Sequence, residues 1–393
     1  MSDDLRTYTG WVPITVGLPI PRGEMMPGAV VRLVQRFGAR RLDVPVQHRV
    51  TARWPEAHRE GGGTVKWLLV DALVWLDRGD EGLLHLEFTN DLQDSPQASF
   101  DWATGFAARI AEGDGPPQGS LDPSVIGRFG FAMAPELGSG EGEFFTAEPR
   151  TPVLETTGSV RSVLRIEGNY VGPANQQVGE FTTRLTLFSG QPYVRIHHTL
   201  VWGRDGMGAD LAAPRGEADF DYERLFRALT FRVPRSADGP CGVVEMGTKL
   251  HGTVHAPQCA PMTFAQVSEG EVERGDSTGV VREAGHLDGW LRVLSRSDAR
   301  EGTFVGLRSA AEQFPSGFQI DERGNVDVAL LRPDRQNWWQ LSSNDDTSGG
   351  FDVETSFPNR PLSESPIGIA KTYELLLWPN ADEPRIHLSL IHI

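Results

Sequence analysis

Helical periodicity is almost absent from this sequence of 393 residues. Apolar residues do not recur at the i, i+3, i+4 and i+7 spacing of an amphipathic helix, whereas short apolar or alternating runs return along the chain. Turn-forming residues separate these runs, and the chain contains 44 Gly and 27 Pro. The sequence therefore predicts an all-β protein built from a barrel or a sandwich.

Strand patterns occur in both halves of the chain. The runs end at Gly, Pro, Asn or Asp, and several alternate apolar and polar residues as a half-buried strand does. On this basis strands are predicted at residues 11–16, 29–34, 46–54, 65–76, 83–89, 160–170, 179–189, 192–202, 228–234, 289–295, 302–309, 326–332 and 370–378.

Length and turn-rich segments together predict two β domains. The chain exceeds the ~250–300 residues at which a single core usually stops growing. A polar stretch at residues 90–96 marks a boundary between strand-rich regions. We therefore predict a small N-terminal β domain at residues 1–95 and a larger β domain at residues 96–380.

The composition argues against several classes of partner and site. The chain has 37 Lys and Arg against 53 Asp and Glu, a net charge of −16, and no basic block, which argues against nucleic acid. No apolar run approaches the ~18 residues of a membrane span. The 2 cysteines cannot form a disulfide-stapled scaffold or a four-thiolate zinc site. Because residues 1–6 lack a signal-peptide pattern, we expect a cytoplasmic location.

The last residues of the chain have a separate interpretation. Residues 388–393 can be back-translated as CTG TCT CTT ATA CAC ATC, which resembles a transposon-end adapter used for sequencing libraries. We interpret this segment as an adapter-derived tail and the reading frame as a fragment. The alternative is a short natural terminal strand, and sequencing the source DNA across codon 388 distinguishes the two.

Two adjacent histidines lie in a strand pattern that also holds an arginine. Strand alternation places Arg195 and His197 on one face and His198 on the opposite, mainly apolar face. His198 is therefore predicted to be a core histidine. A cation beside a titratable base suits an acidic substrate, so Arg195 and His197 are the predicted catalytic pair. A solvated sheet face without a catalytic role is the alternative.

Tryptophans provide the second candidate site. The chain has 10 Trp, and aromatic faces suit the C–H surfaces of sugar rings, although core packing is the alternative for each ring. Trp338 and Trp339 are adjacent, with Arg335 before them and a polar loop after them. These three residues are the predicted substrate-binding platform.

No metal site is predicted, and the sequence identifies no cofactor. His251, His255 and Cys259 have a helical spacing, but Pro257 breaks such a helix. Nucleotide-binding fingerprints and the Gly-x-Ser-x-Gly nucleophile elbow do not occur in the sequence. Whether Cys241 and Cys259 form a disulfide stays open.

Four segments near the N-terminus resemble the opening of a known family. They carry, in order, a Gly/Pro turn, a Pro-x-Gln step, an Arg-Trp-Pro triplet and a Lys-Trp-Leu run, at residues 16–23, 44–47, 52–55 and 64–71. This order is similar to the YetA-like family, which includes the exo-rhamnogalacturonan lyases (PcRGLX-like). An insertion at residues 56–63 replaces the Asp-Gly-Ser step of the family.

The resemblance continues more weakly along the chain. Residues 183–195 resemble the central β-sandwich of that family. Residues 368–375 resemble the segment before its last domain, with Tyr373 where a His is expected. The resemblance implies a RIFT-type N-terminal barrel, a central β-sandwich and a C-terminal α/α toroid, of which the toroid is absent from this chain.

The same resemblance implies an activity. It is β-elimination on an acidic plant polysaccharide or oligosaccharide such as pectic rhamnogalacturonan, in which a base removes the proton α to the uronate carboxylate. The catalytic residues of the family do not map onto positions of this sequence, and we expect the fragment alone to be inactive. The alternatives are a non-catalytic β-sandwich module that binds carbohydrate or a partner, and an accessory region of a glycoside hydrolase.

Overall fold

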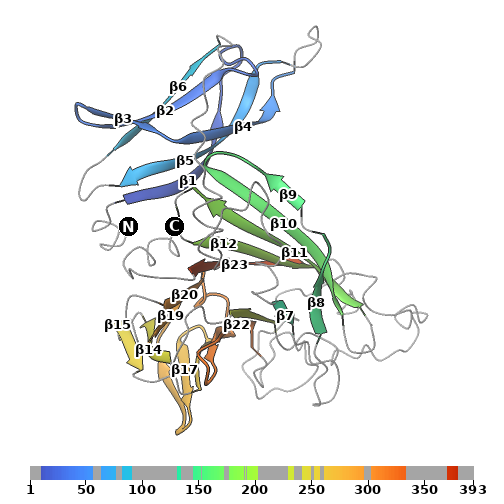
Figure 1. Cartoon of the computed structure of the whole chain (residues 1–393), viewed down its shortest axis with the longest axis vertical. Coiled ribbons are helices and arrows are strands. Elements are labelled where there is room, and N and C mark those ends of the chain that lie inside the picture. Colours follow the sequence, from blue (N-terminus) through green and yellow to red (C-terminus); the bar gives the residue numbers. More distant parts are fainter. Residues whose placement is uncertain are drawn as a thin grey trace, which may run out of the picture.

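In a computed structural model, the described part of the chain consists of β-strands joined by turns (Figure 1). The all-β prediction is confirmed. No helix among these residues is long and apolar enough to cross a membrane. The structure describes residues 10–55, 63–76, 82–90, 131–133, 145–151, 153–171, 177–189, 191, 193–201, 229–233, 241–248, 252–256, 261–295, 302–332 and 370–378.

Residues 10–90 form an N-terminal unit of two three-stranded antiparallel sheets with the orders β1-β5-β4 and β3-β2-β6. Their inward side chains share apolar clusters, in which Val31 packs with Val70 and Leu33 packs with Val74. The two sheets therefore face each other across one core, and the RIFT-type barrel stays a prediction. The strands are β1 (Gly10–Pro19), β2 (Val30–Phe37), β3 (Arg40–Val44), β4 (Val46–Arg53), β5 (Val65–Leu76) and β6 (Leu83–Thr89).

The remaining strands belong to one larger antiparallel sheet. Its first half has the strand order β9-β10-β11-β12-β23-β20-β19-β14-β15. The strands of this half are β9 (Val153–Thr156), β10 (Arg161–Val171), β11 (Gln177–Phe188), β12 (Val194–Val201), β14 (Cys241–Thr248), β15 (Gly252–Ala256), β19 (Leu287–Ser295), β20 (Gly302–Leu307) and β23 (Ala370–Trp378).

The second half has the strand order β7-β13-β22-β21-β16-β17-β18. Strand β8 pairs with both β10 and β7 and so joins the two halves. The strands are β7 (Phe131–Met133), β8 (Phe145–Pro149), β13 (Leu229–Val233), β16 (Met262–Ser268), β17 (Glu271–Asp276), β18 (Gly279–Ala284), β21 (Ser316–Ile320) and β22 (Val326–Leu331).

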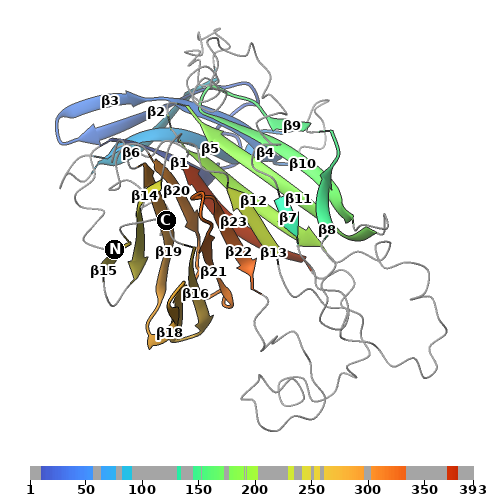
Figure 2. The same ribbon diagram turned by 60° about the horizontal axis from the view of Figure 1, so that its bottom comes forward.

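The two halves enclose the main hydrophobic core. Ile196 of β12 and Leu375 of β23 lie in one buried cluster with Phe231 of β13 and Phe318 of β21. In Figures 1 and 2 the N-terminal sheets lie at one end of the molecule, and β17 and β18 lie at the other end. The opposite face of β11 and β23 carries a second apolar cluster, which includes Phe188, Leu376 and Trp378, and charged side chains lie beside it.

The N-terminal unit contacts the larger sheet through polar groups. The buried carboxylate of Asp71 accepts a hydrogen bond from Thr15 Oγ1 at 2.6 Å and lies 3.2 Å from Arg161 Nη1. Gln47 Oε1 accepts hydrogen bonds from the backbone N–H groups of Val160 and Arg161 at 3.2 and 2.9 Å. Strands β1, β4 and β5 are therefore tied to the start of β10.

Strand prediction succeeded where the apolar pattern is clear. The predicted strands at 65–76, 83–89 and 370–378 coincide with β5, β6 and β23. The strands β14 to β18 were not predicted. The proposed boundary at residues 95 and 96 and the tail at residues 388–393 lie outside the described residues.

Candidate functional site

A row of ionisable side chains crosses four strands of the larger sheet. The strand register pairs Arg165 of β10 with Arg184 of β11, Arg184 with His197 of β12, and His197 with Glu374 of β23. Directly opposed residues of antiparallel strands lie on the same face of the sheet. The four side chains therefore leave the sheet together, on the face opposite the main core.

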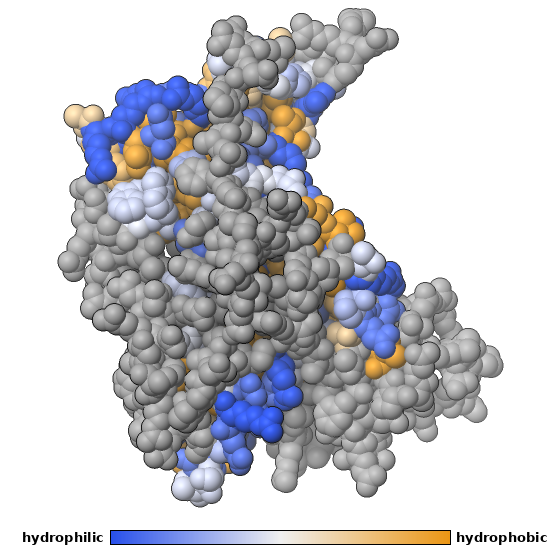
Figure 3. All heavy atoms as spheres, viewed as in Figure 1, coloured by the Kyte–Doolittle hydropathy of each residue, from blue (hydrophilic) through white to orange (hydrophobic). Residues whose placement is uncertain are grey.

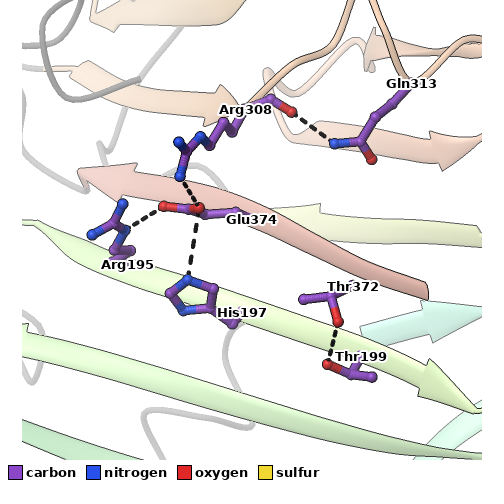
Figure 4. Close-up of polar contacts among 7 residues, drawn as sticks. All are labelled: Arg195, His197, Thr199, Arg308, Gln313, Thr372 and Glu374. Carbon is purple, nitrogen blue, oxygen red and sulfur yellow. Dashed lines mark hydrogen bonds and ion pairs between the residues drawn. The ribbon is translucent and has the colours of Figure 1, made fainter. Parts of the chain in front are cut away.

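Glu374 is the centre of the contacts at one end of this row (Figure 4). Its carboxylate accepts hydrogen bonds from Arg195 Nε and, at 2.8 Å, from Arg308 Nη1, and it lies 3.7 Å from His197 Nε2. Burial alone raises the pKa of Glu374, but the contacts with His197, Arg308 and Arg195 outweigh burial and hold that pKa far below its usual range. Glu374 is therefore ionised at neutral pH.

The structure brings together the predicted pair Arg195 and His197. Both side chains reach Glu374 from the same face of β12, as strand alternation predicted. Arg195 uses its Nε for Glu374, and its two terminal nitrogens donate no hydrogen bond within the described part of the chain. Arg195 can therefore hold Glu374 and a second carboxylate at the same time.

Neutral polar groups flank Glu374 on both sides. Thr199 and Thr372 share a hydrogen bond of 2.8 Å between their hydroxyl groups on neighbouring strands. Gln313 Nε2 donates to the backbone carbonyl of Arg308 at 3.0 Å, while the Gln313 Oε1 atom is buried without a hydrogen-bond partner. The Glu374 end of the row thus carries hydroxyl and amide groups as well as charged side chains.

The other end of the row holds a second acid. Arg184 donates to Glu155 of β9 through Nε at 2.7 Å and through Nη2 at 3.4 Å. The hydrogen bond from Arg184 lowers the pKa of Glu155, and the charges of Arg165 and Arg49 add to the effect. Arg165 Nη1 lies 3.4 Å from Glu167, and the buried Nε of Arg165 has no hydrogen-bond partner.

Arginine and acidic side chains are mixed on this side of the sheet. Its carboxylates are Glu148, Glu155, Glu167, Glu180 and Glu374, with Asp71 of the N-terminal unit at its edge. We call the facing cations, together with His197, the basic face: Arg161, Arg165, Arg184, Arg195 and Arg308. Arg150, which donates a hydrogen bond to Asn169, adds a sixth arginine to this side, so six arginines face six acids. In a chain with an overall charge of −16 this surface is rich in arginine, and its arginine cluster suits an anionic ligand.

His198 is a buried core histidine, which confirms its prediction. Its Nε2 lies 2.6 Å from Tyr170 Oη and its Nδ1 lies 2.9 Å from Thr183 Oγ1. Burial lowers the pKa of His198 to about 4. Both ring nitrogens are therefore occupied by hydroxyl groups of the core, away from the basic face.

The predicted platform of Trp338, Trp339 and Arg335 lies outside the described residues, as does Cys259 of the open disulfide question. In the described ranges, no group of three or more His, Cys, Asp and Glu side chains is arranged to hold a metal ion.

Five charged residues of the site were not predicted, namely Arg161, Arg165, Arg184, Arg308 and Glu374. Each lies in a predicted strand: the first two at residues 160–170, and the others at residues 179–189, 302–309 and 370–378 respectively. Alternation within one strand gives the face of a side chain, but it does not give the neighbouring strand. The signal that would have found them is the register between strands.

One family description matches part of the chain. Residues 136–213 match the PcRGLX-like protein central beta sandwich domain. This segment contains β8 to β12, and so it includes Arg184, Arg195 and His197 of the basic face. The predicted resemblance is confirmed for this central domain, while the RIFT-type barrel and the absent toroid stay predictions.

Two solved structures from Enterococcus faecalis are similar to the chain at 9% identity, and each match covers 94% of this chain. One is a protein in the glycosyl hydrolase family 38, with a TM-score of 0.42 and 42% of its length covered. The other is an alpha-mannosidase from strain V583, with a TM-score of 0.43 and 41% covered. The chain thus spans less than half the length of either protein. No curated protein sequence matches it.

Proposed function

We propose that the chain is part of a polysaccharide-lyase-like protein that acts on uronate-containing polysaccharide, with pectic rhamnogalacturonan as the expected polymer. The observation that carries this proposal is the basic face, which lies largely within the segment similar to the PcRGLX-like central domain. A cluster of five arginines in a chain of charge −16 suits an anionic ligand.

The proposed reaction is β-elimination. A base removes the proton α to the uronate carboxylate, a carbon–carbon double bond forms, and the bond to the leaving sugar oxygen at the β carbon breaks. Positive groups stabilise the charge that develops on the carboxylate. In this proposal His197 is the base, and Arg195 binds the uronate carboxylate through its terminal nitrogens. Glu374 fixes the orientation of both side chains.

A non-catalytic carbohydrate-binding module is the second candidate. It is favoured by the ion pair that Arg195 makes with Glu374 and by the position of His197 beside the same carboxylate. These contacts already fix the positions of both side chains on the sheet, so a structural role accounts for them without catalysis. In this function the basic face binds the acidic polymer, and the chemistry takes place elsewhere in the whole protein.

One set of measurements tests both candidates. The chain is titrated with rhamnogalacturonan and with neutral galactan, and ultraviolet absorbance follows the formation of unsaturated uronate. Binding of the acidic polymer, weakened about tenfold by Arg195→Ala, is expected. Arg36→Ala, which removes an exposed arginine from β2, is the matched control. A rise in absorbance, from this chain or from the full-length gene product, supports the lyase, and binding without that rise in the full-length gene product supports the module. Equal affinity for both polymers would refute recognition by the basic face.

A further inference from the structure

The N-terminal unit exposes a tryptophan that its core does not use. Trp67 of β5 is 42% exposed, whereas Val65 and Leu68 of the same strand are fully buried. Among the described residues, Trp67 is the one aromatic side chain in the set of exposed large hydrophobic residues. Figure 3 shows hydrophobic surface on the part of the molecule that the N-terminal sheets form in Figure 1.

Small residues surround this indole ring on both neighbouring strands. Pro19 of β1 and Ala52 of β4 are the register partners of Trp67. Gly17 is the next residue of β1 on this face, and no heavy atom lies within 4 Å of the position that a Cβ would take there. Because the residues directly opposite Trp67 on both neighbouring strands are small, a ring face of Trp67 is open to the C–H surface of a sugar.

An arginine lies beside this ring on the same face. Arg49 of β4 is the register partner of Leu69, two residues along β5 from Trp67. Such diagonal neighbours lie roughly 7–8 Å apart between strands. Arg49 is exposed, and it makes no hydrogen bond or ion pair within the described ranges. A cation therefore lies next to the open indole, and no acid among the described residues forms an ion pair with it.

The pair also lies within electrostatic range of the basic face. The charge of Arg49 contributes to lowering the pKa of Glu155 on β9. Burial is the largest cause of the lowered pKa of Arg161, and the charges of Arg49 and Arg195 add to it. Arg49 therefore lies close enough to the basic face to interact electrostatically with Glu155 and Arg161.

We propose that Trp67 and Arg49 form a subsite for one uronate residue. The indole stacks on the C–H face of the pyranose ring, and the guanidinium binds the ring's carboxylate. This subsite rests on the proposed function, because its ligand is the same acidic polymer that the basic face binds. In this proposal the N-terminal unit, which lies outside the segment that matches the PcRGLX-like central domain, also binds the polymer.

Calorimetric titration of the full chain with polygalacturonate and with its methyl ester tests the subsite. Trp67→Ala is expected to weaken binding of both polymers about tenfold, because stacking does not depend on the carboxylate charge. Arg49→Ala is expected to weaken only the acidic polymer, also about tenfold. Trp67→Tyr is expected to retain most of the affinity, since it keeps an aromatic face.

Two control variants separate these effects from general changes of the surface. Leu83→Ala removes an exposed apolar side chain from β6, and Arg36→Ala removes an exposed arginine from β2. Both are expected to bind as the unaltered chain does. Undiminished binding by folded Trp67→Ala, with weakened binding by Arg195→Ala, would overturn the subsite and leave the proposed function intact. No binding of either polygalacturonate or rhamnogalacturonan by the unaltered chain would overturn both.

Discussion

Lowering the pH is expected to destabilise the protein through the buried imidazole of His198. The side chain is 1% exposed, and burial lowers its pKa from 6.5 to about 4. The unfolded chain therefore binds the proton near pH 6.5, whereas the folded chain binds it only near pH 4. The stability from this group is fully present above about pH 6.5 and is lost as the pH falls toward about 4. At ~1.4 kcal/mol for each unit of pKa shift, the total loss is about 3 kcal/mol.

Urea unfolding at a series of pH values measures this loss. Between about pH 6 and pH 5, the free energy of unfolding is expected to fall by ~1.4 kcal/mol per pH unit more in the unaltered chain than in His198→Gln. His197→Gln is the matched control, because the neighbouring histidine lies on the opposite, partly exposed face. Burial also lowers the pKa of His48, but His48 is present in all three proteins and its contribution cancels.

The groups that face His198 do not titrate in this range. Tyr170 and Thr183 contact its ring nitrogens, and Tyr373 is its register partner on β23. Burial raises the pKa of both tyrosines above the usual value. The same pH dependence in the unaltered chain and in His198→Gln would refute a histidine that is neutral in the folded state.

Three further predictions concern other parts of the molecule. Asp71→Asn is expected to cost ~2–4 kcal/mol in chemical unfolding, because Arg161 then lies half-buried without its acid; a loss below 1 kcal/mol would contradict this. Gly168→Ala is expected to lower the free energy of unfolding by about 3 kcal/mol, since the new Cβ would lie 2.1 Å from a backbone oxygen. Gly17→Ala, whose Cβ would have no atom within 4 Å, is expected to change it by less than about 0.5 kcal/mol. Calorimetry compares the two variants. Glu374→Gln is expected to raise the affinity for polygalacturonate, because the basic face loses the negative charge next to Arg195 and Arg308; unchanged affinity would speak against binding at that position.

The sequence predicted the elements whose hydrophobic pattern is local. The apolar run at residues 65–76 predicts both ends of β5 correctly. The alternation in β12 places His198 on the core face and Arg195 and His197 on the opposite face. In both cases the information lies within one strand, because side chains alternate between the faces with a period of two.

Other elements could not be predicted because their signal is weak or lies between strands. Strand β18, Gly279–Ala284, is exposed along its whole length, so it has no buried face to produce an apolar pattern. The row from Arg165 to Glu374 depends on which strands pair, and β12 pairs with β23 although about 180 residues separate them. The sequence around Trp67 does not indicate that its side chain is exposed, because the exposure results from the small residues on strands β1 and β4.

The position of β23 has a consequence for how the protein folds. This late strand lies between β12 and β20 and forms hydrogen-bonded ladders with both. Until residues 370–378 have left the ribosome, β12 and β20 each have an open edge along that side, and open edges are templates for pairing between chains. Contacts of such long sequence separation form slowly. Chaperone dependence and aggregation during synthesis should therefore rise sharply in chains that stop before β23.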